Sequence, residues 1–351
     1  YFKYMLISKS RLNISLSPVN TQVKELSAES ENKLLLKVDV RDSTGNPVPM
    51  VRVDISEEPA TGKLQPPALR TDRNGEGLFY YIPPDYSKVK RSGAVKNIKI
   101  TAAIHGSTRS SSFTFALKPV PVVFIHGYQS SGDIFNNMKE YLKRRNISGE
   151  ALTYKSEKGV AHAAKELEDF LDRQHNMYVS RGMQVKRFDL VSHSMGGLVS
   201  RYYTTYDGYI KNMNVRKLIF ISVPQKGSQW ARIGAKYFKD QGIKDLIPDS
   251  EVLVKSLPAL LNKGLNSSIQ TGCITGQYDE VVDLSSSSLE EWNIKTEIFN
   301  IGENNITVGN LLNGKFMESP IHRNILNNKK VFERIQEMLY TDLAYPAARN
   351  Q

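Results

Sequence analysis

Residues 188–198 read FDLVSHSMGGL, a short apolar run that leads to a serine and then to two glycines. The pattern predicts a buried strand over residues 188–191, a tight turn, and a helix that begins at Met195 or Gly196. A serine at the tip of such a turn is held in a strained backbone conformation, so the hydroxyl of Ser194 would stand clear of the sheet. The N-terminus of the following helix favours a negative charge that develops beside it. Ser194 is therefore a candidate nucleophile.

The composition is that of a globular chain. The chain has 351 residues, 40% of them hydrophobic, so it can bury a sizeable core. This length predicts two domains. No run approaches eighteen consecutive apolar residues, so we expect no transmembrane helix. The sequence begins at Tyr1, which we interpret as a mature or trimmed chain. We expect the protein to be secreted or held at the cell surface. A single cysteine, Cys273, excludes an internal disulfide.

The charge is strongly positive and unevenly distributed. The net charge is +11, and residues 1–118 hold 18 Lys and Arg against 11 Asp and Glu, which is +7 of the total. This basic region predicts either an ordinary solvated surface or attachment to a lipid interface or an anionic cell-envelope surface. There is no recognition motif and no basic run interleaved with aromatic residues, so we expect no nucleic-acid partner.

The first third of the chain has the pattern of an all-β domain. After a tail over residues 1–10, residues 11–118 alternate apolar and polar positions between turn signals rich in Gly, Pro and Asn. This pattern predicts an antiparallel sandwich. The stretches VDVRDSTGNPVP (38–49) and TDRNGEG (71–77) resemble bacterial immunoglobulin-like domains. The resemblance implies a spacer or adhesion module without chemistry of its own.

From residue 119 to the C-terminus, the pattern of apolar and polar residues differs from that of the first third. Residues 122–125, VVFI, form an unbroken apolar run, which is typical of a strand buried on both faces of a parallel sheet. Further strands are expected over 151–154, 188–191, 217–224, 269–275 and 297–301, with helices between them and a terminal helix over 329–339. Alternating strands and helices predict a mostly parallel sheet with helices on both faces, an α/β fold over 119–351.

A serine nucleophile needs a base to accept its proton and an acid to orient that base. When these residues follow the order serine, acid, histidine, only one of the six histidines comes after Ser194, and that is His322. It lies in a predicted loop before the last helix. The acid is expected just beyond the strand over 269–275. There Asp279 comes first, and Asp283 is the second choice.

Two backbone N–H groups would stabilise the oxyanion, those of Met195 and Tyr128. Tyr128 follows His126 and Gly127 at the end of the first buried strand, where the chain turns sharply. We expect the His126 side chain to support this loop from beneath. His193 directly precedes the serine, and we expect its side chain to point away from the site and to pack in the core.

Residues 119–340 resemble the α/β-hydrolase family, and bacterial lipases in particular. In that family the corresponding motifs carry the oxyanion loop, the nucleophile, a strand signature, the acid and the base. Here they read PVVFIHGY (121–128), SHSMGGL (192–198), IFISVPQKGS (219–228), YDEVV (278–282) and the final His322. Two positions depart from the family pattern: Ser192 replaces the first glycine of the serine motif, and Gln225 stands where a histidine is usual.

The resemblance implies a serine hydrolase of carboxylic esters, most simply a lipase acting on acylglycerols through an acyl-enzyme. Three alternatives stay open: an esterase for shorter soluble esters, a phospholipid acyl hydrolase or acyltransferase, and a surface-binding protein whose hydrolase fold is not catalytic. The chemistry needs no cofactor and no metal, and the sequence holds no Cys/His ligand cluster. A carboxylate calcium site is left open.

Residues 228–268 form a long insertion between two predicted strands. Asp249 and Ser250 are typical of a helix N-cap. An apolar stripe interrupted by a proline follows, made of Val252, Leu253, Leu257, Leu260, Leu261 and Leu265. The stretch is similar to the lid region of bacterial lipases, and a core-packing helix is the alternative. A lid predicts faster turnover of emulsified than of monomeric ester.

Overall fold

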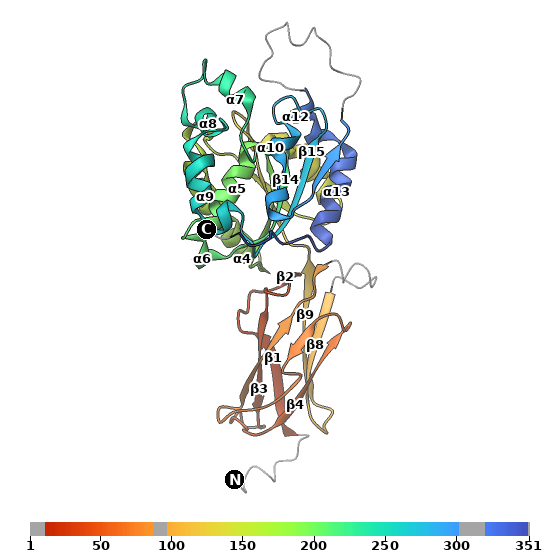
Figure 1. Cartoon of the computed structure of the whole chain (residues 1–351). Helices are drawn as coiled ribbons and strands as arrows, with labels where there is room; N and C mark the ends of the chain where they lie inside the picture. The colour runs from red at the N-terminus through yellow and green to blue at the C-terminus, as the bar shows by residue number, and fades with distance from the viewer. Residues whose placement is uncertain (1–10, 87–96, 302–319, 350–351) are drawn as a thin grey trace. The chain divides into compact units, whose positions relative to one another are not determined.

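The computed structural model describes residues 11–86, 97–301 and 320–349 (Figure 1). The predicted tail over residues 1–10 lies outside this range. The chain forms two compact units, Tyr1–Val120 with His175–Lys186, and Pro121–Gln174 with Arg187–Gln351. The sequence predicted a change of domain at residue 118, two residues before the change in the structure. It did not predict that 175–186 joins the first unit.

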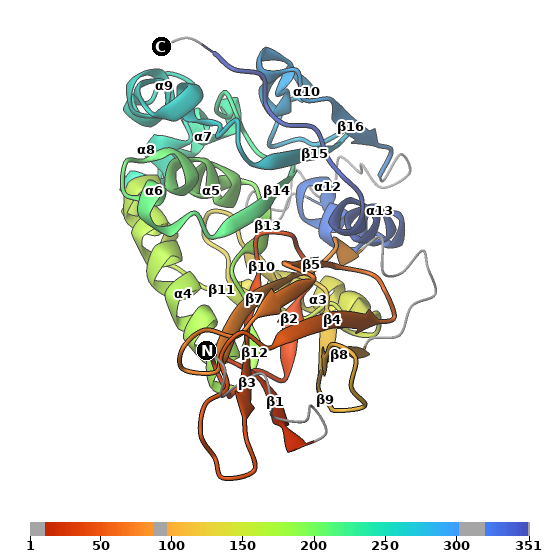
Figure 2. The ribbon, with the colours of Figure 1, turned by 90° about the horizontal axis from the view of Figure 1, so that it is seen from below.

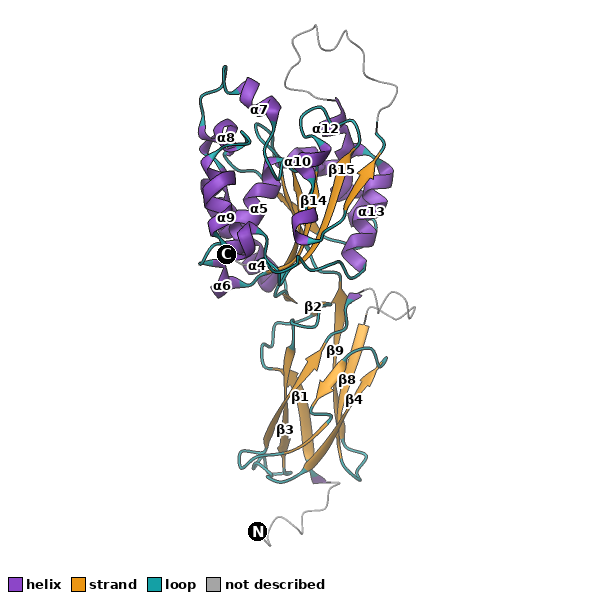
Figure 3. Cartoon of the chain, viewed as in Figure 1, coloured by secondary structure: helices purple, strands orange, loops and turns teal. Residues whose placement is uncertain are grey.

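Residues 11–118 of the first unit form β-sheets, as their period-two pattern predicted (Figure 3). One sheet has the order β1-β3-β7-β5 and the other β12-β2-β9-β8-β4-β6. The strands are β1 (Asn13–Pro18), β2 (Glu25–Ser27), β3 (Leu34–Arg41), β4 (Arg52–Glu58), β5 (Lys63–Gln65), β6 (Ala68–Arg70), β7 (Glu76–Ile82), β8 (Asn97–Ile104), β9 (Ser110–Lys118) and β12 (Met183–Gln184). Most pairs are antiparallel, but β2 runs parallel to both β9 and β12, which the sequence did not predict.

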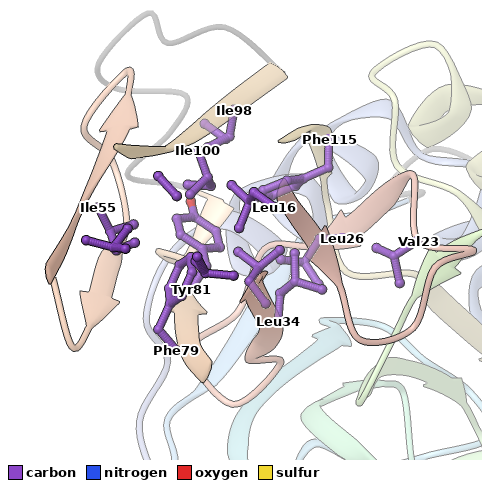
Figure 4. Close-up of a cluster of buried hydrophobic side chains, with 14 of the residues drawn as sticks. Leu16, Val23, Leu26, Leu34, Ile55, Phe79, Tyr81, Ile98, Ile100 and Phe115 are labelled. Carbon is purple, nitrogen blue, oxygen red and sulfur yellow. The ribbon is translucent and has the colours of Figure 1, made fainter. Parts of the chain in front are cut away.

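Alternating burial along these strands builds the core of the first unit. In β3 every second residue is buried, and the residues between them are half-buried. Side chains from both sheets meet in one apolar cluster, which includes Leu34, Phe79, Ile98 and Phe115 (Figure 4). Tyr81 and Phe115 pack edge to face with ring centroids 5.1 Å apart. The period-two pattern therefore acts as predicted, by directing alternate side chains into a common core.

The second unit contains a six-stranded parallel sheet of order β11-β10-β13-β14-β15-β16. The strands are β10 (Val122–Ile125), β11 (Gly149–Leu152), β13 (Phe188–His193), β14 (Val215–Ile221), β15 (Gln270–Gly276) and β16 (Thr296–Phe299). Every residue of β10 and of β13 is buried, as expected for strands covered on both faces. The predicted fold class, an α/β-hydrolase sheet preceded by all-β sheets, is confirmed.

Helices cover both faces of this sheet. In both views α4 and α5 lie on one side and α13 lies on the other, and Figure 2 also shows α3 on the side of α13 (Figures 1 and 2). The helices are α3 (Asn136–Lys143), α4 (Val160–Ser180), α5 (Met195–Thr205), α6 (Tyr209–Asn212), α7 (Gln229–Gly234), α8 (Gln241–Asp245), α9 (Leu257–Ala259), α10 (Leu284–Ser287), α12 (Pro320–Asn324) and α13 (Lys329–Tyr340). None of the described helices is long and apolar enough to span a membrane.

The insertion over 228–268 is built from short pieces. It holds α7 and α8, then a π-helical turn (Val252–Ser256) that runs into α9. The predicted apolar stripe is divided between interior and solvent: Leu257 and Leu265 are buried, whereas Leu261 is exposed. The stripe therefore contributes to the core with part of its length only.

Candidate active site

The turn after β13 has the strained geometry that the sequence predicted. Ser194 has φ 53° and ψ −129°, and α5 begins at the next residue. The turn requires glycine at position 196, because a Cβ there would lie 2.4 Å from the carbonyl oxygen of Ile125. The Ser194 side chain makes no cap hydrogen bond to α5, so its hydroxyl is available to other partners.

Ser192, which replaces the usual glycine of the motif, fits the turn without disturbing it. Its side chain is fully buried, and its Oγ lies 2.7 Å from Oγ of Ser200 in α5. Ser200 Oγ in turn donates to the carbonyl of Gly196 at 3.0 Å. The extra hydroxyl is therefore satisfied within the protein, and the serine motif tolerates the substitution.

Three side chains from distant parts of the chain form a continuous hydrogen-bonded row. Ser194 Oγ lies 2.9 Å from Nε2 of His322, and Nδ1 of His322 lies 2.8 Å from Oδ2 of Asp279. All three residues are buried, with 7%, 7% and 8% of their surfaces exposed. His322 lies in the short helix α12, where the sequence predicted a loop. Asp279 follows the end of β15, as expected.

The surroundings of Asp279 keep its carboxylate charged. Oδ1 accepts hydrogen bonds from the N–H groups of Val281 and Val282, both at 2.9 Å. Burial alone would raise the pKa of Asp279, but the charge and hydrogen bond of His322 and the two backbone donors lower it. A charged Asp279 fixes the proton of the ring on Nδ1, which leaves Nε2 of His322 as an acceptor for the Ser194 hydroxyl. Asp283, the second choice, is exposed at the start of α10.

The two expected oxyanion donors are the N–H groups of Met195 and Tyr128. Met195 follows Ser194 in the chain, and the loop that carries Tyr128 passes close to Ser194 in space. Met195 is the first residue of α5, so its N–H has no partner within the helix. Gly127, which precedes Tyr128, passes so close that a Cβ on it would lie 2.9 Å from Cβ of Ser194. Among the described residues, neither the Tyr128 nor the Met195 N–H has a hydrogen-bond acceptor. Both groups are thus available to a ligand.

Side chains around Tyr128 hold this loop in place. Nδ1 of His126 bonds the carbonyl of Gly127 at 2.7 Å, and its Nε2 accepts the N–H of Tyr154 at 3.1 Å. The Tyr128 hydroxyl donates to Asp240 at 2.6 Å, and Asp240 also caps α8. Burial and the neighbouring Asp240 carboxylate raise the pKa of Tyr128. The hydrogen bond from Tyr128 to Asp240 could not be predicted from the sequence, because the two residues are 112 positions apart.

A pocket opens above Ser194, and its wall carries few charges. It is lined by Gly127, Tyr128, Gln129, Ser130, Ile134, His193, Ser194, Pro224, Ser228, Trp230, Ala231, Leu246, Val281, His322 and Arg323. The insertion over 228–268 thus contributes Ser228, together with Trp230 and Ala231 of α7, and Leu246 after α8. The residues of the predicted apolar stripe do not line it. Among the described residues of this wall, Arg323 alone carries a permanent charge.

The prediction that His193 points away from the site is wrong. Its ring lines the pocket and lies 4.6 Å from the ring of His322, measured between centroids. Nε2 of His193 lies 2.8 Å from the carbonyl oxygen of His322. The alternation of side chains in a strand does not apply at this position, because the chain leaves β13 through the strained turn at Ser194.

Two further features bear on ligands and on the family pattern. In the described part of the chain, no group of three or more His, Cys, Asp or Glu is arranged to hold a metal ion. Gln225, which stands where the family has a histidine, accepts a hydrogen bond from Arg201 at 3.0 Å.

A family model for the PGAP1-like alpha/beta domain matches residues 116–240. The matched segment contains Tyr128 and Ser194 and ends before Asp279 and His322. The second unit has the α/β-hydrolase fold. No curated protein matches the sequence significantly.

Several solved structures resemble this hydrolase domain at low sequence identity. The mature lipase BlEst2 of Bacillus licheniformis is 16% identical, with a TM-score of 0.48, covering 63% of this chain and 92% of the lipase. The esterase EaEST of Exiguobacterium antarcticum is 14% identical, with a TM-score of 0.43 and coverages of 64% and 93%. Phospholipase PlaB of Legionella pneumophila is 17% identical, with a TM-score of 0.38 and coverages of 49% and 45%.

Proposed function

We propose that this protein is a serine hydrolase that cleaves carboxylic esters through an acyl-enzyme. The observation that carries the proposal is the buried row of hydrogen bonds from Asp279 through His322 to Ser194. A nucleophile, a base within reach of its proton, and an acid that orients the base are the parts that this chemistry requires. The strained turn at Ser194 supports the same role.

The reaction would proceed in two halves. Ser194 Oγ attacks the ester carbonyl carbon while Nε2 of His322 takes the hydroxyl proton, and the N–H groups of Tyr128 and Met195 stabilise the oxyanion. His322 then gives its proton to the departing alcohol, and the acyl group stays on Ser194. Water, deprotonated by the same ring, attacks the acyl-enzyme, and His322 returns this proton to Ser194 Oγ as the carboxylic acid leaves. Asp279 holds Nδ1–H of His322 throughout and stabilises its positive charge.

The wall of the pocket suits an ester with an apolar acyl group. Ile134, Trp230, Leu246 and Val281 offer carbon surface close to Ser194. We therefore favour a lipase acting on acylglycerols, and we keep shorter esters and phospholipids as alternatives. A surface-binding protein without activity is the alternative of a different class. Secretion, and attachment to a lipid or envelope surface through the basic first unit, stay predictions.

The test is hydrolysis of p-nitrophenyl esters of increasing acyl length by the wild type and Ser194→Ala. We expect the variant to lose at least about 10⁴-fold in kcat, because the nucleophile is removed and only binding and oxyanion contacts remain. The control is Ser180→Ala, which removes an exposed hydroxyl bonded only to the Met177 carbonyl. Preference for long chains would support a lipase, and preference for short chains an esterase. Full activity of Ser194→Ala, or an inactive wild type, would contradict the proposal.

A further inference from the structure

His193 occupies a position that the proposed reaction does not itself require. It is the last residue of β13, directly before Ser194, and only 3% of its surface is exposed. Its Nε2 lies 2.8 Å from the main-chain carbonyl oxygen of His322. A carbonyl can only accept, so the ring proton lies on Nε2 and His193 donates. Its Nδ1 is buried without a partner among the described residues.

This hydrogen bond joins the residue directly before Ser194 to the main chain of His322, and the distance between Ser194 and His322 decides whether the proton can be transferred. The helix that carries His322, α12, has only five residues, so its own hydrogen bonds fix the ring weakly. The strand β13 is held on both sides, by β10 and β14. A displacement of about 1 Å at a reacting group costs roughly 10²-fold in rate. A contact from the end of β13 to the backbone of His322 would prevent such a displacement.

We propose that His193 is a positioning residue: its Nε2–H holds the main chain of His322 so that the ring bridges Ser194 and Asp279. This inference rests on the proposed function and adds a residue to it. In this role His193 takes no proton in the reaction and acts by holding the main chain of His322.

The chemistry of the position favours a donor without charge. During the reaction His322 becomes an imidazolium, and a permanent cation in contact with its ring would oppose that change. Burial and the charge of His322 lower the pKa of His193 to about 3. Among the groups that act on this ring, Arg323 lowers the pKa further, whereas Asp279 and the bond to the His322 carbonyl raise it. His193 is therefore neutral at the pH of the reaction, which a lysine or an arginine would not be.

The test compares two substitutions of His193 in the full chain. Gln has an amide nitrogen at a reach similar to that of Nε2 and keeps a neutral donor, whereas Leu has none. With a short p-nitrophenyl ester, we expect His193→Leu to lower kcat about 100-fold with KM changed less than twofold. We expect His193→Gln to recover at least tenfold of that loss. The rate at which an organophosphate labels Ser194 should fall and recover in parallel.

A matched control separates positioning from general destabilisation. Asn266, buried elsewhere in the same unit, donates in the same way to the carbonyl of Thr204 at 2.8 Å. Asn266→Leu should lower Tm while leaving kcat of the folded protein within twofold of the wild type. An unchanged kcat in His193→Leu would overturn the inference, as would a His193→Gln variant that folds but is as slow as Leu. If His193→Leu does not fold, His193→Gln decides: near wild-type kcat supports the inference, and a 100-fold loss overturns it. Full activity of Ser194→Ala would instead overturn the proposed function itself.

Discussion

Replacing Asp279 by asparagine tests the hydrogen-bonded row with the smallest change of shape. Oδ1 of Asp279 accepts two backbone N–H groups, those of Val281 and Val282, and Oδ2 accepts Nδ1–H of His322. In Asp279→Asn the amide oxygen must stay on the two backbone donors, because an amide NH₂ cannot accept them. The NH₂ group therefore faces His322.

This exchange reverses the tautomer of the ring. An amide N–H pointing at Nδ1 makes Nδ1 an acceptor, so the proton moves to Nε2, which then faces the Ser194 hydroxyl at 2.9 Å as a donor. The ring can no longer take the serine proton. We expect kcat to fall about 10⁴-fold, which is about 5 kcal/mol in activation free energy. The two backbone hydrogen bonds remain, so the free energy of unfolding should fall by only about 1–3 kcal/mol.

The assay is steady-state hydrolysis of a p-nitrophenyl ester at pH 8, with Tm measured on the same samples. Asp283→Asn is the matched control, because Asp283 is an exposed acid four residues away, and its kcat should stay within twofold of the wild type. A loss smaller than tenfold in Asp279→Asn would refute the assignment of Asp279 as the orienting acid. A large loss in Asp283→Asn with an active Asp279→Asn would transfer that role to Asp283.

Three further predictions concern the turn, the C-terminal helix and pH. Gly196→Ala should lower kcat more than 100-fold and lower the free energy of unfolding by about 2 kcal/mol or more. The Cβ of the alanine would lie 2.4 Å from the Ile125 carbonyl oxygen. A variant with wild-type kcat and Tm would contradict this prediction. Lys217→Met should lower the free energy of unfolding in urea by about 3 kcal/mol, while the folded variant keeps its kcat. The reason is that the buried ammonium of Lys217 donates to three main-chain carbonyls at the end of α13 and just beyond it. A change below about 1 kcal/mol would show that water replaces these hydrogen bonds. Because the folded pKa of His193 is about 3, below the value of about 6.5 expected unfolded, the unfolded chain binds this proton more readily between the two. Urea unfolding from pH 6 to pH 4 should therefore show stability falling by up to about 1.4 kcal/mol per pH unit from this group, and His193→Gln should show a shallower fall; equal slopes would contradict it.

The sequence by itself was sufficient for the features that depend on local pattern and chain order. The run VVFI at 122–125 identified a strand buried on both faces, and FDLVSHSMGGL identified the strand, strained turn and helix around Ser194. His322 was chosen as the base because it is the only histidine after Ser194 in the sequence. Asp279 was preferred to Asp283 as the acid because it comes first after the predicted strand over 269–275. The strands and the turn lie where the sequence predicted them because side-chain periodicity and the position of a turn are properties of neighbouring residues.

The tertiary structure decided what depends on residues far apart in the chain. Nothing near His193 in the sequence indicates that it bonds the carbonyl of His322, 129 residues away. The parallel pairing of β2 with β12 joins segments about 160 residues apart, and a three-residue strand is too short to show which partner it will take. Likewise, apolar residues of the insertion were visible in the sequence, but packing put Trp230 at the pocket and Leu257 in the core. Hydrophobicity determines that a side chain is buried, whereas its partner is fixed only when the whole chain has folded around it.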